Sequence, residues 1–431
     1  YIGSYADPTR SNAERGWFEP NLKMAGNEAI YFNFEAKREA ELNRENATTV
    51  SVFLQDRVQG DLRKEIELPD ASVLQNFDSV SIDLYMGCDG EGEYGTCPAW
   101  DYMAYLYMCD QPQEPTNPHN TTTCQPSVPE VFGECYLNGT AVDGDCTEDE
   151  DCRPEESTEE SSDDYSCEGY QAAILADTLV GECTNPIGDT TEGTHTCNDT
   201  GSGYSDINCP CQTEIGRWIT TYHREGRWVY DISAMLPLLS KGGRQIFRFD
   251  TPGPYLLDLD LRFKSTGKTL KPTETRYLFS GGRISPDYNA SYEPLTMNIP
   301  ANAKKVELAT VLSGHNMNNP GNCAEFCNIS HHFTINSQQD RTIVRDFPEA
   351  GAQYDCMDKV SEGTVPNQYG TWWYGRSGWC PGKEVPTVMT DITDQVNLGA
   401  TNTFEYKALY QGQDYPGSAT IRMRSWIVIS E

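Results

Sequence analysis

The sequence predicts an all-β protein of the antiparallel sandwich type. Apolar and polar residues alternate in several segments, among them 257–263 and 421–429. This period of two buries one face of each strand, as packed antiparallel sheets require. Clusters of Pro and Gly, such as 251–254, separate the segments and predict turns. The most helix-like segment, 35–45, is short and charged on nearly all sides, so little helix is expected.

Length and composition favour a globular protein of more than one domain. At about 150 residues per domain, 431 residues correspond to two or three domains. Apolar residues make up 37% of the chain, which is enough for a sizeable core. The chain has 65 acidic and 32 basic residues and a net charge of −33, which would repel polyphosphates and anionic lipids. We therefore expect no nucleic-acid partner and no membrane partner.

The cysteines predict disulfides and an oxidising compartment. There are sixteen, and the sequence contains no repeated C-x-x-C pair and no C-x-x-C followed by H-x-x-x-H. This usage favours disulfides over metal ligands and indicates a secreted protein, extracellular or periplasmic. The chain starts at Tyr1 without a Met or an apolar signal segment, as expected of a processed secreted protein.

One segment, about 109–211, differs in composition from the rest. It contains ten cysteines, and within it residues 141–170 hold thirteen acidic residues and one Arg. Such a stretch cannot bury enough apolar surface to offset its ordering entropy, so we expect an insertion held by disulfides. The carboxylates of 143–151 suggest a Ca²⁺ site, but their spacing departs from the calcium-loop pattern. A solvated acidic loop is the preferred interpretation.

Polar residues near 264–272 predict a linker between two halves. We expect three parts: an N-terminal extension at 1–40, a first β-sandwich domain at 41–268 that contains the insertion, and a second at 269–431.

Three short cysteine loops carry polar side chains suited to catalysis. They are Cys88 to Cys97 followed by Trp100-Asp101, Cys323 to Cys327 around Glu325, and Cys380 beside Arg376 and Trp379, with Cys356 as a plausible partner. A disulfide across a short loop fixes the backbone and can hold a carboxylate in one geometry. Taken singly, each loop is better explained as a rigid turn with a surface acid.

Four motifs in order resemble the peptide-N-glycosidase F family. They are Cys97-Pro-Ala-Trp-Asp101, Gly216-Arg-Trp-Ile-Thr-Thr-Tyr222, Ser313-Gly with Cys323-Ala-Glu-Phe-Cys327, and Arg376-Ser-Gly-Trp-Cys-Pro-Gly-Lys-Glu-Val-Pro-Thr387. The resemblance covers residue 78 to the C-terminus without the insertion. It implies two adjacent jelly-roll-like antiparallel sandwiches, with the disulfide-rich insertion in the first and the site in the cleft between them.

The resemblance also implies an activity. The family hydrolyses the amide between Asn and the first N-acetylglucosamine of N-linked glycans, releasing the intact glycan and leaving Asp. Its substrates are N-glycosylated peptides and glycoproteins, and it needs no metal or other cofactor. A monomer is expected.

The family's essential Asp falls on Asp101 and its essential Glu on Glu325. A third family Glu aligns with Asp250, which is one methylene shorter. Two carboxylates from different loops can split the acid and base roles of amide hydrolysis if their surroundings separate their pKa values. The expected substrate contacts are Trp100, Tyr102, Tyr222, His315, Arg376 and Trp379.

Two departures from the family leave the glycan preference open. Tyr102 stands where the family has Arg, and Pro252 where it has Trp. With the shortened Asp250, they leave room for an alternative, an N-glycan-binding protein without catalysis. Retention of Asp101 and Glu325 within their cysteine loops favours the enzyme.

A copper monooxygenase on paired β-sandwiches is a further alternative, but it needs several His ligands. The chain has six His and no H-x-H spacing, and the adjacent pair His331 and His332 would point to opposite faces of a strand. The sequence therefore disfavours copper.

Overall fold

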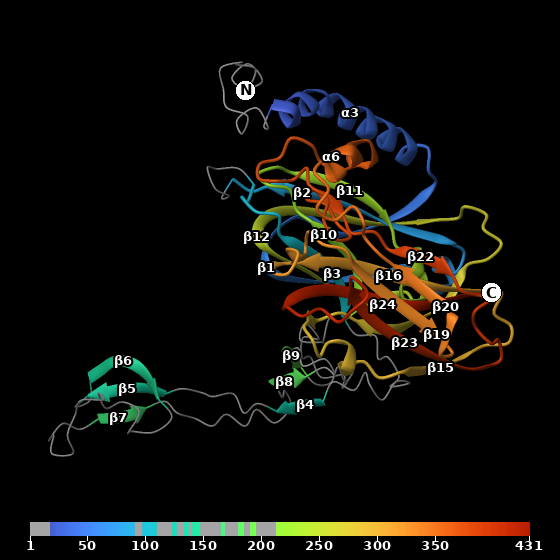
Figure 1. The fold of residues 1–431 in the computed structure, drawn as a ribbon. Coiled ribbons are helices and arrows are strands. Elements are labelled where there is room, and N and C mark those ends of the chain that lie inside the picture. Colours follow the sequence, from blue (N-terminus) through green and yellow to red (C-terminus); the bar gives the residue numbers. More distant parts are fainter. Residues whose placement is uncertain are drawn as a thin grey trace. The chain divides into compact units, whose positions relative to one another are not determined.

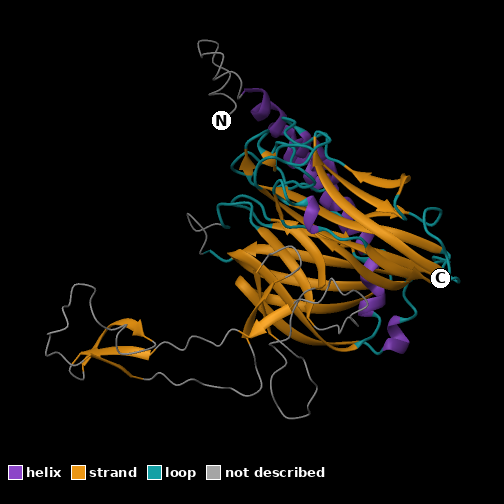
Figure 2. Cartoon of the chain, turned by 60° about the horizontal axis from the view of Figure 1, so that its bottom comes forward, coloured by secondary structure: helices purple, strands orange, loops and turns teal. Residues whose placement is uncertain are grey.

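The structure is a computed structural model that describes residues 18–90, 97–109, 123–126, 133–137, 140–146, 165–168, 180–184, 190–194 and 213–431. The chain forms two compact units, one of Tyr1–His119 with Cys211–Glu431 and the other of Asn120–Pro210. Antiparallel strands dominate the described residues, and helices are few (Figure 1, Figure 2). The prediction of an all-β sandwich protein is confirmed.

The first sheet has seven strands in the order β11-β2-β12-β3-β10-β21, with β1 paired to the other edge of β12. Their bounds are β1 (Ala47–Leu68), β2 (Ser79–Cys88), β3 (Met103–Cys109), β10 (Thr213–Ile219), β11 (Gly226–Asp231), β12 (Gly243–Lys264) and β21 (Lys383–Glu384).

Strand β12 belongs to both halves of this sheet. Residues 246–250 pair with β3, and residues 255–264 pair with β2. The predicted turn at 251–254 is instead a bend inside one strand. Pro252 and Pro254 have no N–H to donate, so the ladder is interrupted there while the chain stays extended. The bend folds the sheet over one core, in which the alternating apolar residues of 257–263 are buried.

The second sandwich consists of two further sheets. One has the order β13-β24-β16-β22 with β14 on β24, and the other has the order β15-β23-β19-β20. Their bounds are β13 (Pro272–Ser280), β14 (Arg283–Ile284), β15 (Leu295–Ile299), β16 (Lys305–His315), β19 (Ile329–Ile335), β20 (Gln338–Arg345), β22 (Val388–Asp391), β23 (Ala400–Tyr410) and β24 (Ala419–Ser430). Residues 265–271 connect β12 to β13.

Strands β16 and β24 are buried on both faces. Leu308 and Ile427 point into the core between the two sheets of the second sandwich. Ala309 and Trp426 point the other way, into the core that includes the first sheet. The two sandwiches therefore share a continuous apolar contact, which fixes the relative positions of the loops at its edge.

A buried arginine crosses the same contact. Arg217 of β10 is 1% exposed, and its guanidinium donates to both carboxylate oxygens of Glu214 at 2.7 and 2.9 Å. It also donates to Ser313 Oγ at 2.9 Å and to the carbonyl oxygen of Arg422 at 2.8 Å. A buried charge is tolerated when it is paired and hydrogen-bonded in this way.

The main helix is longer than the sequence predicted. Helix α3 (Phe18–Leu42) spans 25 residues, where only 35–45 looked helical. The helix has only a few apolar positions on one face, because it packs mainly on one short segment and through polar contacts. The Phe34 ring lies against Gly363, and Arg38 donates to the carbonyl oxygen of Arg227 at 2.6 Å.

The remaining elements of the first unit are short. They are α4 (Ala71–Leu74), η5 (Ser233–Met235), α5 (Leu236–Leu239), η6 (Asn289–Ser291), β17 (Met317–Asn318), β18 (Cys323–Ala324), α6 (Asp355–Asp358) and η7 (Lys359–Glu362). None of the helices in the described part of the chain has the length and apolar character that crossing a bilayer requires.

The second unit lies within the cysteine-rich insertion. It has one three-stranded sheet of β4 (Thr123–Pro126), β8 (Val180–Thr184) and β9 (Thr190–Thr194), and another of β5 (Gly133–Leu137), β6 (Thr140–Cys146) and β7 (Tyr165–Glu168). The side chains that would distinguish a Ca²⁺ site from a solvated acidic loop lie outside the described residues, as do the insertion's disulfides.

Replacing the buried arginine should destabilise the protein strongly. Arg217→Met leaves the Glu214 carboxylate buried without its main partner, and we expect a loss of about 3–5 kcal/mol in the free energy of unfolding. Urea unfolding followed by Trp fluorescence measures it. Arg244→Met is the matched control, because Arg244 is half exposed and its ion pair with Glu65 should contribute less than about 1 kcal/mol. Equal losses in the two variants would contradict the assigned role of Arg217.

Candidate active site

Three disulfides brace the loops that carry the expected site residues. They join Cys88 to Cys97, Cys323 to Cys327, and Cys356 to Cys380. These are the same pairs that the sequence analysis named.

Asp101 comes directly before β3, in a segment anchored to the end of β10. The backbone N–H of Tyr102 donates to Thr220 Oγ1 at 2.9 Å, and the N–H of Thr220 donates to the Tyr102 carbonyl oxygen at 2.8 Å. Thr220 Oγ1 in turn donates to the Trp100 carbonyl oxygen at 3.2 Å. Both neighbours of Asp101 are thus fixed, which holds its carboxylate in place.

Glu325 follows β18 and is anchored through its backbone. Its N–H donates to the Asn316 carbonyl oxygen at 3.0 Å, and its carbonyl oxygen accepts from the N–H of Ser377 at 2.8 Å. Close packing at Gly314 supports the loop, since a Cβ there would lie 2.2 Å from the carbonyl oxygen of Ala324. Only glycine allows this approach of β16 to the Glu325 loop.

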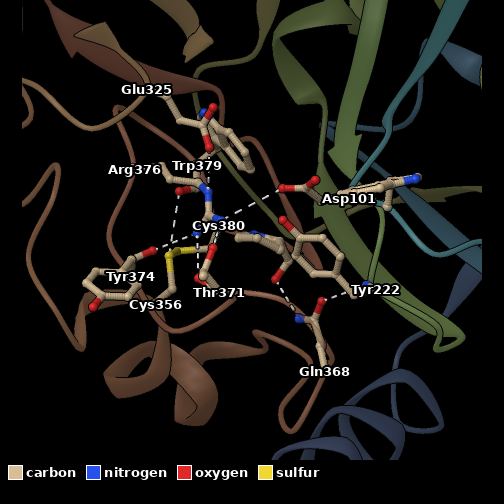
Figure 3. Close-up of polar contacts among 12 residues, drawn as sticks. Asp101, Tyr222, Glu325, Cys356, Gln368, Thr371, Tyr374, Arg376, Trp379 and Cys380 are labelled. Carbon is tan, nitrogen blue, oxygen red and sulfur yellow. Dashed lines mark hydrogen bonds and ion pairs between the residues drawn. A yellow bond between two sulfur atoms is a disulfide. The ribbon is translucent and has the colours of Figure 1, made fainter. Parts of the chain in front are cut away.

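Arg376 lies between the two acids (Figure 3). Its side chain is 1% exposed, and its Nε donates to Glu325 Oε1 at 3.1 Å. Its Nη1 donates to the carbonyl oxygens of Tyr374 and Thr371 at 2.9 and 3.3 Å, and its Nη2 donates to Thr371 Oγ1 at 3.4 Å. The same Nη2 is 3.9 Å from Asp101 Oδ2.

One guanidinium N–H therefore remains available toward Asp101. An arginine has five N–H donors, and the hydrogen bonds to Glu325, Tyr374 and Thr371 use four of them. The distance from Nη2 to Asp101 is longer than a hydrogen bond. The fifth donor can thus reach a substrate oxygen or a water molecule beside Asp101.

Aromatic rings flank the guanidinium on both sides. Its central carbon lies 4.9 Å from the centre of the Trp379 ring and 5.1 Å from that of the Phe326 ring. Trp379 is itself held, because its indole N–H donates to the Gly314 carbonyl oxygen at 2.7 Å and the ring of His315 stacks on it at 5.1 Å. Cation–π contacts of this kind stabilise a desolvated arginine.

Burial raises the pKa of both acids. For Asp101 it outweighs the charge of Arg376 and a hydrogen bond from Tyr222, both of which lower the pKa. For Glu325 it outweighs Arg376, and the charge of Asp101 raises the pKa further. The side chains are still 18% and 17% exposed, so substrate can reach them. Two coupled acids with raised pKa values can hold and exchange a proton above the usual carboxylate range.

Tyr222 orients Asp101. Its hydroxyl donates to the Asp101 carboxylate, and burial, followed by the charge of Asp101, raises the pKa of Tyr222 so that the hydroxyl keeps its proton. The backbone N–H of Tyr222 donates to Gln368 Oε1 at 3.0 Å, and Gln368 Nε2 donates to the carbonyl oxygens of Val365 and Pro381 at 2.6 and 2.8 Å.

The other expected residues lie at different distances from this cluster. Trp100 is 63% exposed next to Asp101, and Tyr102 is half-buried. His315 is half-buried against Trp379; burial, followed by nearby arginines, lowers its pKa to about 3, so its ring is neutral. Asp250 faces Arg248 at 3.5 Å and is paired across strands with Asp61. Neither Arg248 nor Asp61 belongs to the cluster around Arg376.

Sequence reasoning missed Gln368, Thr371, Tyr374 and Phe326. Thr371 and Tyr374 act through backbone carbonyl oxygens and, for Thr371, one side-chain oxygen, and a carbonyl has no residue-type signature. Phe326 acts through its ring, which lies beside the Arg376 guanidinium. Gln368 is the only Gln in its loop, but nothing in its spacing marks it as a support for Tyr222.

Within the described ranges, one group of side chains comes close enough to hold a metal ion. It consists of Asp355, Cys356 and Cys380. Because the two cysteines form a disulfide, neither offers a thiolate.

Comparisons with known proteins find a family that resembles the C-terminal part of the chain. Residues 286–428 match the family model of the C-terminal part of peptide-N-glycosidase F. A curated relative from Elizabethkingia miricola, peptide-N(4)-(N-acetyl-beta-D-glucosaminyl)asparagine amidase F, is 32% identical over 116 residues. These matches support a relationship between the C-terminal part of the chain and the peptide-N-glycosidase F family. The match to that relative covers 26% of this chain and 30% of the relative's length.

Solved structures show the same fold. PNGase F, a glycosylasparaginase from Flavobacterium meningosepticum, has a TM-score of 0.50 and 16% identity, over 90% of this chain and 96% of that one. PNGF-II has a TM-score of 0.52 and 12% identity, over 91% of this chain and 67% of that one. This chain therefore shares its two-sandwich fold with both of these structures.

The raised pKa of Glu325 should make stability fall as the pH rises. Its contribution is fully present below the ordinary value of 4.5 and is lost as the pH passes through the higher folded-state pKa. Glu325→Gln cannot ionise, so the unfolding temperature of the wild type should fall relative to this variant as the pH rises above 4.5. Scanning calorimetry across this range measures the difference.

Asp78 provides a control of opposite sign. Burial opposes ionisation of Asp78, but hydrogen bonds from Thr266 and Lys268 lower its pKa overall. Its stabilising contribution is present above the ordinary value of 3.8 and is lost as the pH falls. The wild type should therefore gain stability relative to Asp78→Asn as the pH rises. Parallel trends for the two variants would refute the assigned shift at Glu325.

Proposed function

We propose that the protein is an amidase that cleaves the bond between Asn and the first N-acetylglucosamine of N-linked glycans. It would release the intact glycan and convert Asn to Asp. The observation that carries the proposal is the meeting of Asp101 and Glu325 at the buried guanidinium of Arg376. The similarity of residues 286–428 to the peptide-N-glycosidase F family supports the same reaction. The substrates would be N-glycosylated peptides and glycoproteins, and the disulfides support action in an oxidising, secreted setting.

Asp101 is the proposed base. The Tyr222 hydroxyl and the Arg376 charge favour its ionised form, and the hydrogen bond from Tyr222 fixes its orientation. Water attacks the amide carbon and gives a proton to Asp101. The fifth N–H donor of Arg376 would stabilise the negative charge that develops on the carbonyl oxygen.

Glu325 is the proposed acid. Burial raises the pKa of Glu325 against the opposing charge of Arg376, and the charge of Asp101 raises it further, which favours a protonated Glu325. It passes this proton to the leaving nitrogen as the carbon–nitrogen bond breaks. The products are an Asp side chain and a glycosylamine, which then loses ammonia in water.

N-glycan binding without catalysis is the second candidate. The observation that favours it is the position of Asp250, which lies beside Arg248 and opposite Asp61 on the neighbouring strand. A third acid engaged in this way contributes only indirectly to the reaction at Asp101. Product analysis separates the two candidates.

Heavy oxygen should enter the peptide at the former glycan site. A denatured N-glycoprotein is incubated with the protein in ¹⁸O-water, and the peptides are analysed by mass spectrometry. Amide hydrolysis leaves an ¹⁸O-labelled Asp and an intact glycan. An Asn that retains one sugar would identify an endoglycosidase and rule out the amidase, and unchanged glycopeptides would favour binding alone.

The three acids should differ in their importance. Asp101→Asn and Glu325→Gln keep the side-chain shape but remove the proton-transfer group, so each should lower kcat/KM by about 10²–10⁴-fold. Asp250→Asn should cost less than about tenfold, because its charge acts from outside the cluster. Steady-state kinetics on one glycopeptide measures all three, with glycan binding and intact disulfides checked in each variant. A loss below tenfold at Asp101 or Glu325 would show that the residue is not catalytic.

A further inference from the structure

We propose that Tyr369 is a stacking platform for a sugar ring beyond the first N-acetylglucosamine, and so determines how much of the glycan is recognised. This inference rests on the proposed function for the nature of the ligand. Tyr369 is 69% exposed, as much as any large apolar or aromatic residue in the described part of the chain. It belongs to none of the motifs that resemble the family.

Both sequence neighbours of Tyr369 contact Tyr222, which in turn contacts Asp101, the candidate base. Its neighbour Gln368 accepts the backbone N–H of Tyr222 at 3.0 Å. Its other neighbour, Gly370, lies so close to Tyr222 that a Cβ there would be 3.0 Å from the ring. Tyr222 reaches Asp101 with its hydroxyl, so the loop that carries Tyr369 packs against the side chain that contacts Asp101. A sugar placed there is the next one along the glycan, because the first must lie over the two acids.

The ring is held rigidly although it is exposed. The ring of His223 meets that of Tyr369 edge to face, with centroids 4.8 Å apart. The backbone on either side takes left-handed conformations, with φ of 51° at Asn367 and 67° at Gly370. Single exposed aromatic residues are common on protein surfaces, but they are not usually fixed at the edge of a candidate site.

Helix α3 contributes to this rigidity. Glu28 accepts from Asn367 Nδ2 at 3.0 Å and from Arg224 Nη1 at 2.7 Å. Arg224 also donates to the carbonyl oxygen of Pro366. A ring fixed before binding loses little conformational entropy when a ligand covers it, which increases the net affinity of a stacking contact.

The chemistry of the platform fits a neutral pyranose. The C–H face of a sugar packs on an aromatic face without requiring a charge, and the phenol hydroxyl at the ring edge can hydrogen-bond to sugar hydroxyls. Trp100 offers a second exposed ring next to Asp101. A peptide side chain beside the glycosylated Asn is the competing occupant, and the experiment below distinguishes it.

The test compares two glycopeptides of the same peptide sequence, one with a single N-acetylglucosamine and one with two or more core sugars. Tyr369→Ala should raise KM by about tenfold on the longer glycan, leave kcat nearly unchanged, and change KM less than about twofold on the single sugar. Tyr369→Phe keeps the ring and should recover most of the lost affinity. Phe32→Ala is the matched control, because Phe32 is equally exposed, at 69%, on α3.

An equal rise in KM on both glycopeptides would assign Tyr369 to the first sugar or to the peptide and overturn the proposal. No rise on either would overturn it as well. Calorimetric binding of free chitobiose and free N-acetylglucosamine in a Glu325→Gln background gives a readout that needs no turnover. Chitobiose binding that weakens in Tyr369→Ala supports the platform even if ¹⁸O labelling disproves the amidase, whereas unchanged binding disproves the platform alone.

Discussion

The candidate site depends on one buried positive charge, the guanidinium of Arg376. A cation that is 1% exposed cannot keep its hydration shell, so the protein must surround it with acceptors. Glu325, Asp101 and the carbonyl oxygens of residues 371 and 374 supply that environment. Because these groups come from separate loops, each loop must be held in position for the charge to be satisfied. The disulfides and the close approach at Gly314 serve this requirement.

The two-sandwich architecture makes such convergence possible. Asp101 precedes a strand of the first sheet, whereas Glu325 and Arg376 belong to loops at the end of β16 in the second sandwich. Both faces of β16 are buried, so the sandwiches cannot slide past each other without exposing apolar surface. Arg217 adds directional hydrogen bonds across the same contact. The site is thus preorganised by packing that lies outside it, which is how polar groups keep a fixed geometry during a reaction.

Residue patterns in the sequence predicted some of the strands and site residues but missed other features of the structure. Alternation identified the strands at 257–263 and 421–429, because half-buried strands leave a period of two in the sequence. The motifs around Asp101, Glu325 and Arg376 marked residues that the fold does bring together. The bend in β12 looked like a turn, since Pro and Gly interrupt pairing in either case and only the partner strands reveal which occurs. The extent of α3 was missed because a helix that packs on one short segment needs few apolar positions.

Hydrogen bonds between residues far apart in the sequence also escaped prediction, and they link helix α3 to Asp101. Glu28 on α3 holds Asn367 and Arg224; the adjoining Gln368 holds the backbone of Tyr222, whose hydroxyl holds Asp101. These residues are close in space, yet Glu28 and Asn367 are more than three hundred residues apart in the sequence. The exposed Tyr369 and the candidate base therefore share one support. The loop that carries Tyr369 therefore also contacts Tyr222, the residue that orients Asp101.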